Sequence, residues 1–222
     1  MQDIKGVVFD VDGVLIDSLE PHLRLCRDKN IEYSLGLTIP SVEEFKALVR
    51  SGVKVSPMKF FFLSVGFPEY YADLATEYYN EFFMQEYEPE PFEGLDNVFA
   101  SLKSSGIGIG LVTSNVKGNI YKPLANYLHY FRSNCILAKE DYSGDSKANA
   151  ILIVAERLGV RPSETLYIGD QISDKVAADE AGVKFAGVNY GWGLSGEEMD
   201  FPVYESVYEI AKSITSEAPL CS

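Results

Sequence analysis

Short apolar runs alternate with segments of helical periodicity through the second half of the chain. Strands are expected near residues 6–10, 107–112, 136–137, 165–168 and 185–188, and helices near 95–105, 119–128, 147–158 and 173–181. Strands that alternate with helices predict a parallel sheet whose two faces are covered by the helices. The pattern therefore predicts an α/β protein with a doubly wound parallel-sheet core.

A different pattern separates the first strand from the others. Residues 18–90 carry many aromatic side chains at helical spacing, and helices are expected over 41–51 and 68–87. Ser41 followed by Glu44 is typical of a capped helix start. A segment rich in proline and charge, residues 86–94, ends this pattern. We therefore expect a core domain formed by 1–17 and 91–222, and an inserted α-helical cap domain formed by 18–90.

Charge and cysteine content restrict the partners and the compartment. The 222 residues include 33 acidic and 19 basic side chains, a formal net charge of −14, which argues against nucleic acid or an anionic membrane as partner. A site for an anionic substrate would have to supply its own positive charge, which a divalent cation held by carboxylates would provide. The cysteines Cys26, Cys135 and Cys221 lack metal-ligand spacing and fit a reducing compartment. With no signal-peptide pattern and no apolar run long enough for a bilayer, a cytoplasmic protein is expected.

Two carboxylates, Asp10 and Asp12, follow the first strand directly and precede Gly13. Glycine lets the chain turn at this point, so that both carboxylates can address one pocket. One of them could attack a substrate while the other moves a proton. The same residues would also fit a strand that ends in an ordinary Asp-Gly turn.

Polar residues at the ends of other strands extend this set. They are Thr113, Ser114 and Asn115 after the strand 107–112, Asp170 after the strand 165–168, and Asp174 and Lys147 on adjoining helices. In an open parallel sheet, ligands bind beyond the carboxyl ends of the strands. Carboxylates serve as nucleophiles and Mg²⁺ ligands, and hydroxyl, amide and ammonium groups hold phosphate oxygens. Each residue alone also fits a helix cap, a turn or a surface position, but together they favour phosphoryl transfer.

These motifs resemble those of the haloacid dehalogenase superfamily, in its phosphatase branch with a helical cap. Residues 10–18 resemble the first motif, Thr113 the second, and the segment from Gly169 through Asp174 the fourth. Phosphoglycolate phosphatases and β-phosphoglucomutases share this layout. Relatives often carry Lys-Pro at the third motif, whereas Ala148 follows Lys147 here, which leaves Lys139 as an alternative.

The resemblance implies a Rossmann-like core and a role for each matched residue. Asp10 is expected to attack phosphorus, and Asp12 to act as general acid and base. Binding of the substrate phosphate is expected from Thr113, Ser114, Asn115 and Lys147. The resemblance implies Mg²⁺ as cofactor, held by Asp10, Asp170, Asp174 and the backbone carbonyl of Asp12.

We therefore expect a Mg²⁺-dependent phosphatase that hydrolyses a small phosphorylated metabolite through an aspartyl-phosphate intermediate. A phosphomutase of the β-phosphoglucomutase type and a non-catalytic protein that binds a phosphate ligand remain alternatives. The cap is expected to select the substrate, and we hypothesise that Arg50, Ser51 and Lys54 face the pocket. The sequence identifies neither the physiological substrate nor the oligomeric state.

Overall fold

The computed structural model describes residues 3–142, 146–195 and 199–215. Its helices are α1 Leu19–Glu32, α2 Val42–Arg50, α3 Met58–Ser64, α4 Glu69–Glu86, α5 Leu95–Ser104, α6 Lys117–Tyr121, α7 Lys147–Leu158, α8 Ile172–Glu180 and α9 Val207–Thr215. Its strands are β1 Gly6–Phe9, β2 Ile16–Asp17, β3 Glu90–Pro91, β4 Gly108–Val112, β5 Ile136–Leu137, β6 Thr165–Gly169, β7 Lys184–Val188 and β8 Val203–Tyr204. None of the helices in the described ranges is long and apolar enough to cross a membrane.

Six strands form one parallel sheet in the order β5-β4-β1-β6-β7-β8. The first strand along the chain, β1, lies in the interior of this sheet, where Val8 is paired with Gly110 of β4 and with Tyr167 of β6. The predicted α/β fold class with a doubly wound parallel sheet is confirmed.

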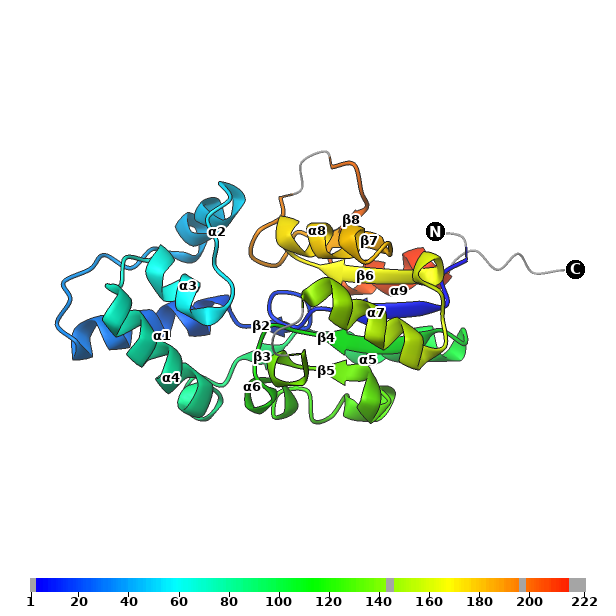
Figure 1. Ribbon diagram of the computed structural model, residues 1–222, viewed down its shortest axis with the longest axis horizontal. Coiled ribbons are helices and arrows are strands. Elements are labelled where there is room, and N and C mark those ends of the chain that lie inside the picture. The colour runs from blue at the N-terminus through cyan, green and yellow to red at the C-terminus, as the bar shows by residue number, and fades with distance from the viewer. Residues whose placement is uncertain (1–2, 143–145, 196–198, 216–222) are drawn as a thin grey trace, which may run out of the picture.

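Helices cover both faces of the sheet (Figure 1). Alternate residues of β1 belong to different hydrophobic clusters. Val7 and Phe9 belong to the core that α5 and α9 complete, whereas Val8 packs with residues of α7 and α8. The side chains of β1 are buried on both faces. The sequence of β1 is therefore a continuous apolar run, because helices bury both faces of a strand in such a parallel sheet.

Helices α1 to α4 form an insertion between β1 and β4 that lies to one side of the sheet (Figure 1). We call residues 18–90 the helical insertion. It carries a hydrophobic cluster rich in aromatic side chains, most of which belong to these four helices. The short strands β2 and β3 pair in antiparallel fashion where the chain enters and leaves the insertion. The predicted helix start is confirmed, because Ser41 and Glu44 form a reciprocal capping box at α2.

The sequence pattern misassigned two regions. The helix expected over 119–128 is wrong, since α6 ends at Tyr121 and turns follow it. Pro123 has no N–H to donate to the carbonyl of Asn119, and its ring obstructs a helix at this point. Strand β8 and helix α9 were not predicted, although α9 packs against α5. Of the cysteines, Cys26 and Cys135 are free and buried, and Cys221 lies outside the described residues.

Candidate active site

Three neighbouring strands bring the predicted polar residues to one edge of the sheet. Asp10, Thr113 and Asp170 each directly follow the last residue of β1, β4 and β6. A cavity of about 570 Å³ opens beyond this edge, with walls from the sheet and from the helical insertion. Of the predicted site residues, those that line it are Asp10, Asp12, Thr113, Ser114, Asn115, Lys147 and Asp174. Asp170 is fully buried and does not line the cavity.

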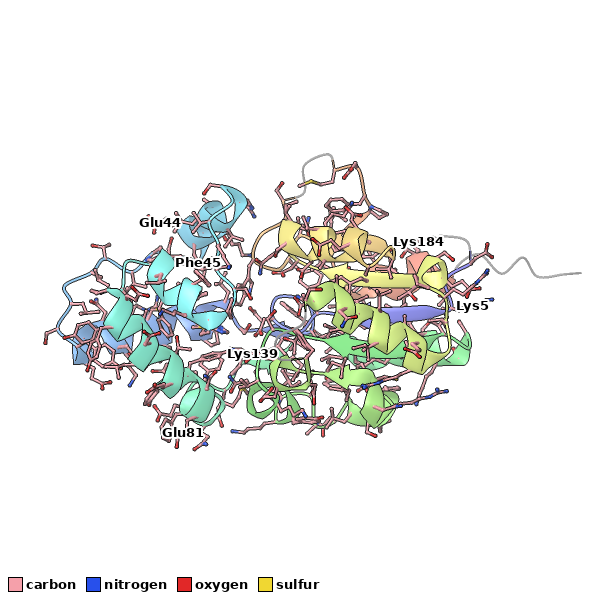
Figure 2. All side chains as sticks on the ribbon, in the orientation of Figure 1. Lys5, Glu44, Phe45, Glu81, Lys139 and Lys184 are labelled. Atoms are coloured by element: carbon pink, nitrogen blue, oxygen red, sulfur yellow. The ribbon has the colours of Figure 1, made fainter. Side chains whose placement is uncertain are left out.

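Lys147 lies between two carboxylates. Its Nζ is 2.7 Å from Oδ2 of Asp10 and 2.7 Å from Oδ1 of Asp174. Ser146 caps the helix that begins at Lys147, and its hydroxyl accepts the N–H of Asn149. The contact with Asp10 places the start of α7 beside the end of β1. Lys139, the alternative lysine, also lines the cavity, and Figure 2 places it between the sheet and the helical insertion.

Asp10, Asp170 and Asp174 form a cluster of acceptors that suits a cation. One carboxylate oxygen from each lies within 4.8 Å of the others, and all three residues are buried. Asp170 accepts the backbone N–H of Trp192 at Oδ2 (2.6 Å), but its Oδ1 is buried with no hydrogen-bond donor among the described residues. Because Mg²⁺ prefers oxygen ligands, these residues fit it by chemistry and by burial.

The carboxylate of Asp12 lies outside this cluster and has other partners. Ser18 Oγ donates to its Oδ1 at 2.7 Å, and Asn115 Nδ2 donates to its Oδ2 at 2.8 Å. The amide of Asn115 is itself fixed, since its Oδ1 accepts the backbone N–H of Val116 and Nδ2 of Asn119. The two carboxylates that follow β1 are thus held differently, one by a lysine and one by neutral donors.

Thr113 and Ser114 supply hydroxyl groups beside Asp10. Thr113 is buried, and its Oγ1 accepts the backbone N–H of Asn115 at 3.1 Å. The carbonyl of Thr113 accepts the hydroxyl of Tyr142 at 2.8 Å, which fixes the turn after β4. Both residues therefore belong to a defined turn at the cavity wall.

The buried charges strongly perturb one another. Burial raises the pKa of Asp10 to about 7, helped by the Asp174 carboxylate and opposed by Lys147. Burial also raises the pKa of Asp170 well above its usual value, together with the nearby carboxylates of Asp174 and Asp10. For Lys147, burial works against the charged form, but Asp10 and Asp174 raise its pKa well above the ordinary value. Lys147 thus contacts two of the three buried carboxylates, and a divalent cation would relieve the remaining repulsion.

Sequence reasoning missed His22 and Tyr79, which belong to the wall formed by the helical insertion. His22 lies 2.5 Å from the carbonyl of Ser18 through Nδ1 and 3.2 Å from the Tyr79 hydroxyl through Nε2. Burial lowers the pKa of His22, against the opposing effects of Asp12 and the Ser18 carbonyl. A lone histidine after the first motif gives no signal of its own, and Tyr79 belongs to an aromatic stripe that indicates packing.

The hypothesis on insertion residues holds only in part. Lys54 lines the cavity, whereas Arg50 and Ser51 are exposed and are not among its lining residues. Arg50 lies in the last turn of α2, and the loop after it carries Lys54 toward the cavity.

Comparison with known proteins places this site in a family. A family model described as haloacid dehalogenase-like hydrolase matches residues 7–188. The chain belongs to this family. The predicted resemblance is therefore confirmed, and the match spans the site residues from Asp10 through Asp174.

Named relatives of this chain include two phosphatases. The N-acetylmuramic acid 6-phosphate phosphatase of Pseudomonas aeruginosa is 27% identical over 85% of this chain and 83% of its own. The phosphoglycolate phosphatase of Escherichia coli K12 is 27% identical over 94% of this chain and 90% of its own. Among solved structures, a protein described as a predicted phosphatase from Clostridium acetobutylicum matches with a TM-score of 0.74 and 25% identity, over 96% of this chain and 99% of that one.

Proposed function

We propose that this protein is a Mg²⁺-dependent phosphatase that hydrolyses a small phosphomonoester through an aspartyl-phosphate on Asp10. Family membership and the named relatives make the chain a phosphoric monoester hydrolase. The observation that carries the mechanism is the separation of two carboxylates at one cavity. Asp10 lies beside Lys147 and the acidic cluster, and Asp12 lies with neutral donors.

Asp10 is the proposed nucleophile. One carboxylate oxygen attacks phosphorus, and the bond between phosphorus and the ester oxygen breaks. The ammonium of Lys147, 2.7 Å from the carboxylate, offsets the negative charge that the phosphoryl group brings. Thr113 and Ser114 line the cavity beside it, so that their hydroxyls are available to hold phosphoryl oxygens.

Asp12 is the proposed proton carrier. In the first step it gives its proton to the departing ester oxygen. In the second it takes a proton from the water that attacks the aspartyl-phosphate, and the bond between Asp10 and phosphorus breaks. Ser18 and Asn115 hold the Asp12 carboxylate in one orientation. A group that transfers a proton in both steps needs such a fixed orientation.

Asp10, Asp170 and Asp174 are the proposed side-chain ligands of Mg²⁺, with the backbone carbonyl of Asp12. Bound there, Mg²⁺ would neutralise charge on the transferring phosphoryl group. Two observations support this assignment: Oδ1 of Asp170 has no hydrogen-bond donor in the part of the chain that the structure describes, and the three carboxylates lie close together. Between the two candidate lysines, we assign the third-motif role to Lys147, because its ammonium contacts two of these carboxylates.

The helical insertion is the proposed cap domain, with residues 1–17 and 91–222 as the core. The paired strands β2 and β3 at its base support this boundary. Side chains of the insertion form part of the cavity wall, so its closure would exclude water from the phosphoryl group. We also propose a reducing, cytoplasmic location, with which the buried free thiols of Cys26 and Cys135 agree.

The proposed substrates are small phosphorylated metabolites. A cavity of about 570 Å³ is of the size typical for small ligands. Relatives are named for N-acetylmuramic acid 6-phosphate and phosphoglycolate, so both compounds belong in a first panel.

Release of inorganic phosphate tests the proposal. Wild type, D10N and the control D179N are assayed on an aryl phosphate and on the panel, with Mg²⁺ and with chelator. Asp179 makes the control an Asp-to-Asn change on the same protein at an exposed position of α8. We expect turnover that requires Mg²⁺, a fall of roughly 10⁴-fold or more in D10N, and no change in D179N. Turnover in D10N at the wild-type rate would refute the aspartyl-phosphate. Conversion between phosphorylated isomers without phosphate release would favour the phosphomutase alternative.

A further inference from the structure

The loop 190–193, which follows β7, lies between Asp170 and the helical insertion. Its Trp192 belongs to the hydrophobic cluster of the insertion, and among the described residues it is the cluster's only buried member from outside 19–87. The indole ring packs edge-on against His22, Phe45 and Phe61, with centroid distances of 5.1, 6.4 and 5.7 Å. A residue of the sheet domain is thus anchored among side chains of the insertion.

The backbone of the same loop packs directly on Asp170. The N–H of Trp192 donates to Oδ2 of Asp170 at 2.6 Å, and the N–H of Gly193 donates to the Asp170 carbonyl at 3.2 Å. A Cβ added to Gly191 would lie 2.5 Å from Asp170 Cβ and 2.5 Å from the carbonyl oxygen of Gly13. The loop therefore has no free space on this side, and a shift of its backbone must shift the Asp170 carboxylate.

Two further contacts join this loop to α2. A Cβ on Gly193 would lie 2.7 Å from Cγ1 of Val49, and Nζ of Lys46 lies 3.4 Å from the carbonyl of Tyr190. The insertion thus contacts both the Trp192 side chain and the backbone of the loop.

We propose that Trp192 is a positioning residue that couples the place of the helical insertion to the Asp170 carboxylate. The proposal rests on the metal part of the proposed function, since it makes Mg²⁺ affinity depend on packing inside the insertion. Any displacement of the insertion moves the indole, the indole moves its own backbone N–H, and this N–H orients Oδ2 of Asp170. Coupling is reciprocal, so Mg²⁺ binding must also change the environment of the indole ring.

Two matched substitutions test the coupling far from the metal. Phe45 and Phe62 are both fully buried in the cluster of the insertion, but only Phe45 contacts Trp192, whereas Phe62 packs against Phe61 and Phe67. F45L and F62L remove similar apolar volume, and urea denaturation measures how much stability each loses. V49A, at a half-buried position against Gly193, is a milder second variant.

The readouts are the dissociation constant of Mg²⁺ by calorimetry and the emission of Trp192, which is the only tryptophan of the chain. In wild type we expect Mg²⁺ to change this emission, with W192F as the blank. F45L should weaken Mg²⁺ binding about 2- to 30-fold and shift the emission of the metal-free protein to the red, and V49A should act in the same direction. F62L should keep the wild-type affinity and emission.

The outcomes separate this inference from the function that it rests on. If wild type binds Mg²⁺, and F45L and F62L change the Mg²⁺ affinity equally or not at all, the coupling is refuted and the proposed function is left intact. Wild type that binds no Mg²⁺ would refute the metal part of the proposed function and the coupling with it.

Discussion

The substitution K147M should destabilise the metal-free protein strongly. It removes the Lys147 ammonium but keeps most of the apolar length of the side chain. Each of its two contacts is 2.7 Å long, and at an effective dielectric constant of about 20 such a pair attracts by roughly 6 kcal/mol. Burial of the three charged groups costs several kcal/mol each and offsets most of this gain. The substitution nevertheless removes only the cation, so that two carboxylates remain buried without their partner. A loss of about 3–5 kcal/mol in the free energy of unfolding follows.

Lys59 offers a matched control, because it also bridges two carboxylates. Its Nζ lies 3.1 Å from Glu69 and 2.8 Å from Asp73, but the side chains of these residues are 79% and 54% exposed. After K59M both carboxylates stay in water, and we expect a much smaller loss than in K147M. Urea denaturation of both variants and wild type in chelator at pH 8 measures the difference.

The pH dependence gives a second check on the same variant. Since the pKa of Asp10 is about 7 in the folded protein, the carboxyl is largely protonated at pH 5 and ionised at pH 8. The K147M substitution should therefore cost more at pH 8 than at pH 5. Equal losses in K147M and K59M, or a K147M loss that does not grow with pH, would refute the reasoning.

Three further predictions address the metal, the first motif and the insertion. In chelator the free energy of unfolding of wild type should fall as the pH rises from about 4 to about 7, because the pKa of Asp10 is raised in the folded state and the stability that this group contributes is lost above that value. Mg²⁺ should reduce the fall. A flat profile in chelator would contradict the prediction. G13A should lose about 1–3 kcal/mol more of the free energy of unfolding, measured in urea, than G52A. Both glycines have positive φ, but a Cβ on Gly13 would lie 2.3 Å from a carboxylate oxygen, whereas one on Gly52 would meet nothing within 4 Å. Equal losses would contradict close packing at the first motif. K54A should raise KM for the best substrate of the panel, while R50A should leave it unchanged. The reverse order would show that the last turn of α2, and not the loop after it, presents the cation to substrate.

The sequence predicts the sheet and the residues at its edge because both depend on local patterns. A strand buried on both faces must be apolar throughout, and polar residues such as Asp10, Thr113 and Asp170 stand out where each strand ends. The carboxyl ends of parallel strands meet at one edge whatever the loops do, so that these residues come together without further information.

The partners of these residues were beyond prediction because they come from distant parts of the chain. Asn115 reaches Asp12 across 103 positions of sequence, and no spacing rule distinguishes this role from direct binding of phosphate. Trp192 is a similar case, since the sequence indicates only a loop after a strand near the site. Its contact with Phe45 depends on how the insertion packs against the sheet.

The choice between two lysines shows where local reasoning ends. Lys139 and Lys147 both precede the strand β6 and both line the cavity, and the missing proline after Lys147 weakened the motif match. In the structure Lys147 is the first residue of α7, a helix that packs against β1 and β4 and begins beside the carboxyl end of β1. This start places Nζ 2.7 Å from both Asp10 and Asp174. The Ser146 hydroxyl already fixes the first turn of α7, so the start of the helix does not depend on a proline at the next position. The geometry that we propose for phosphate binding thus needs the capped helix and its packing, and not the Lys-Pro pair itself.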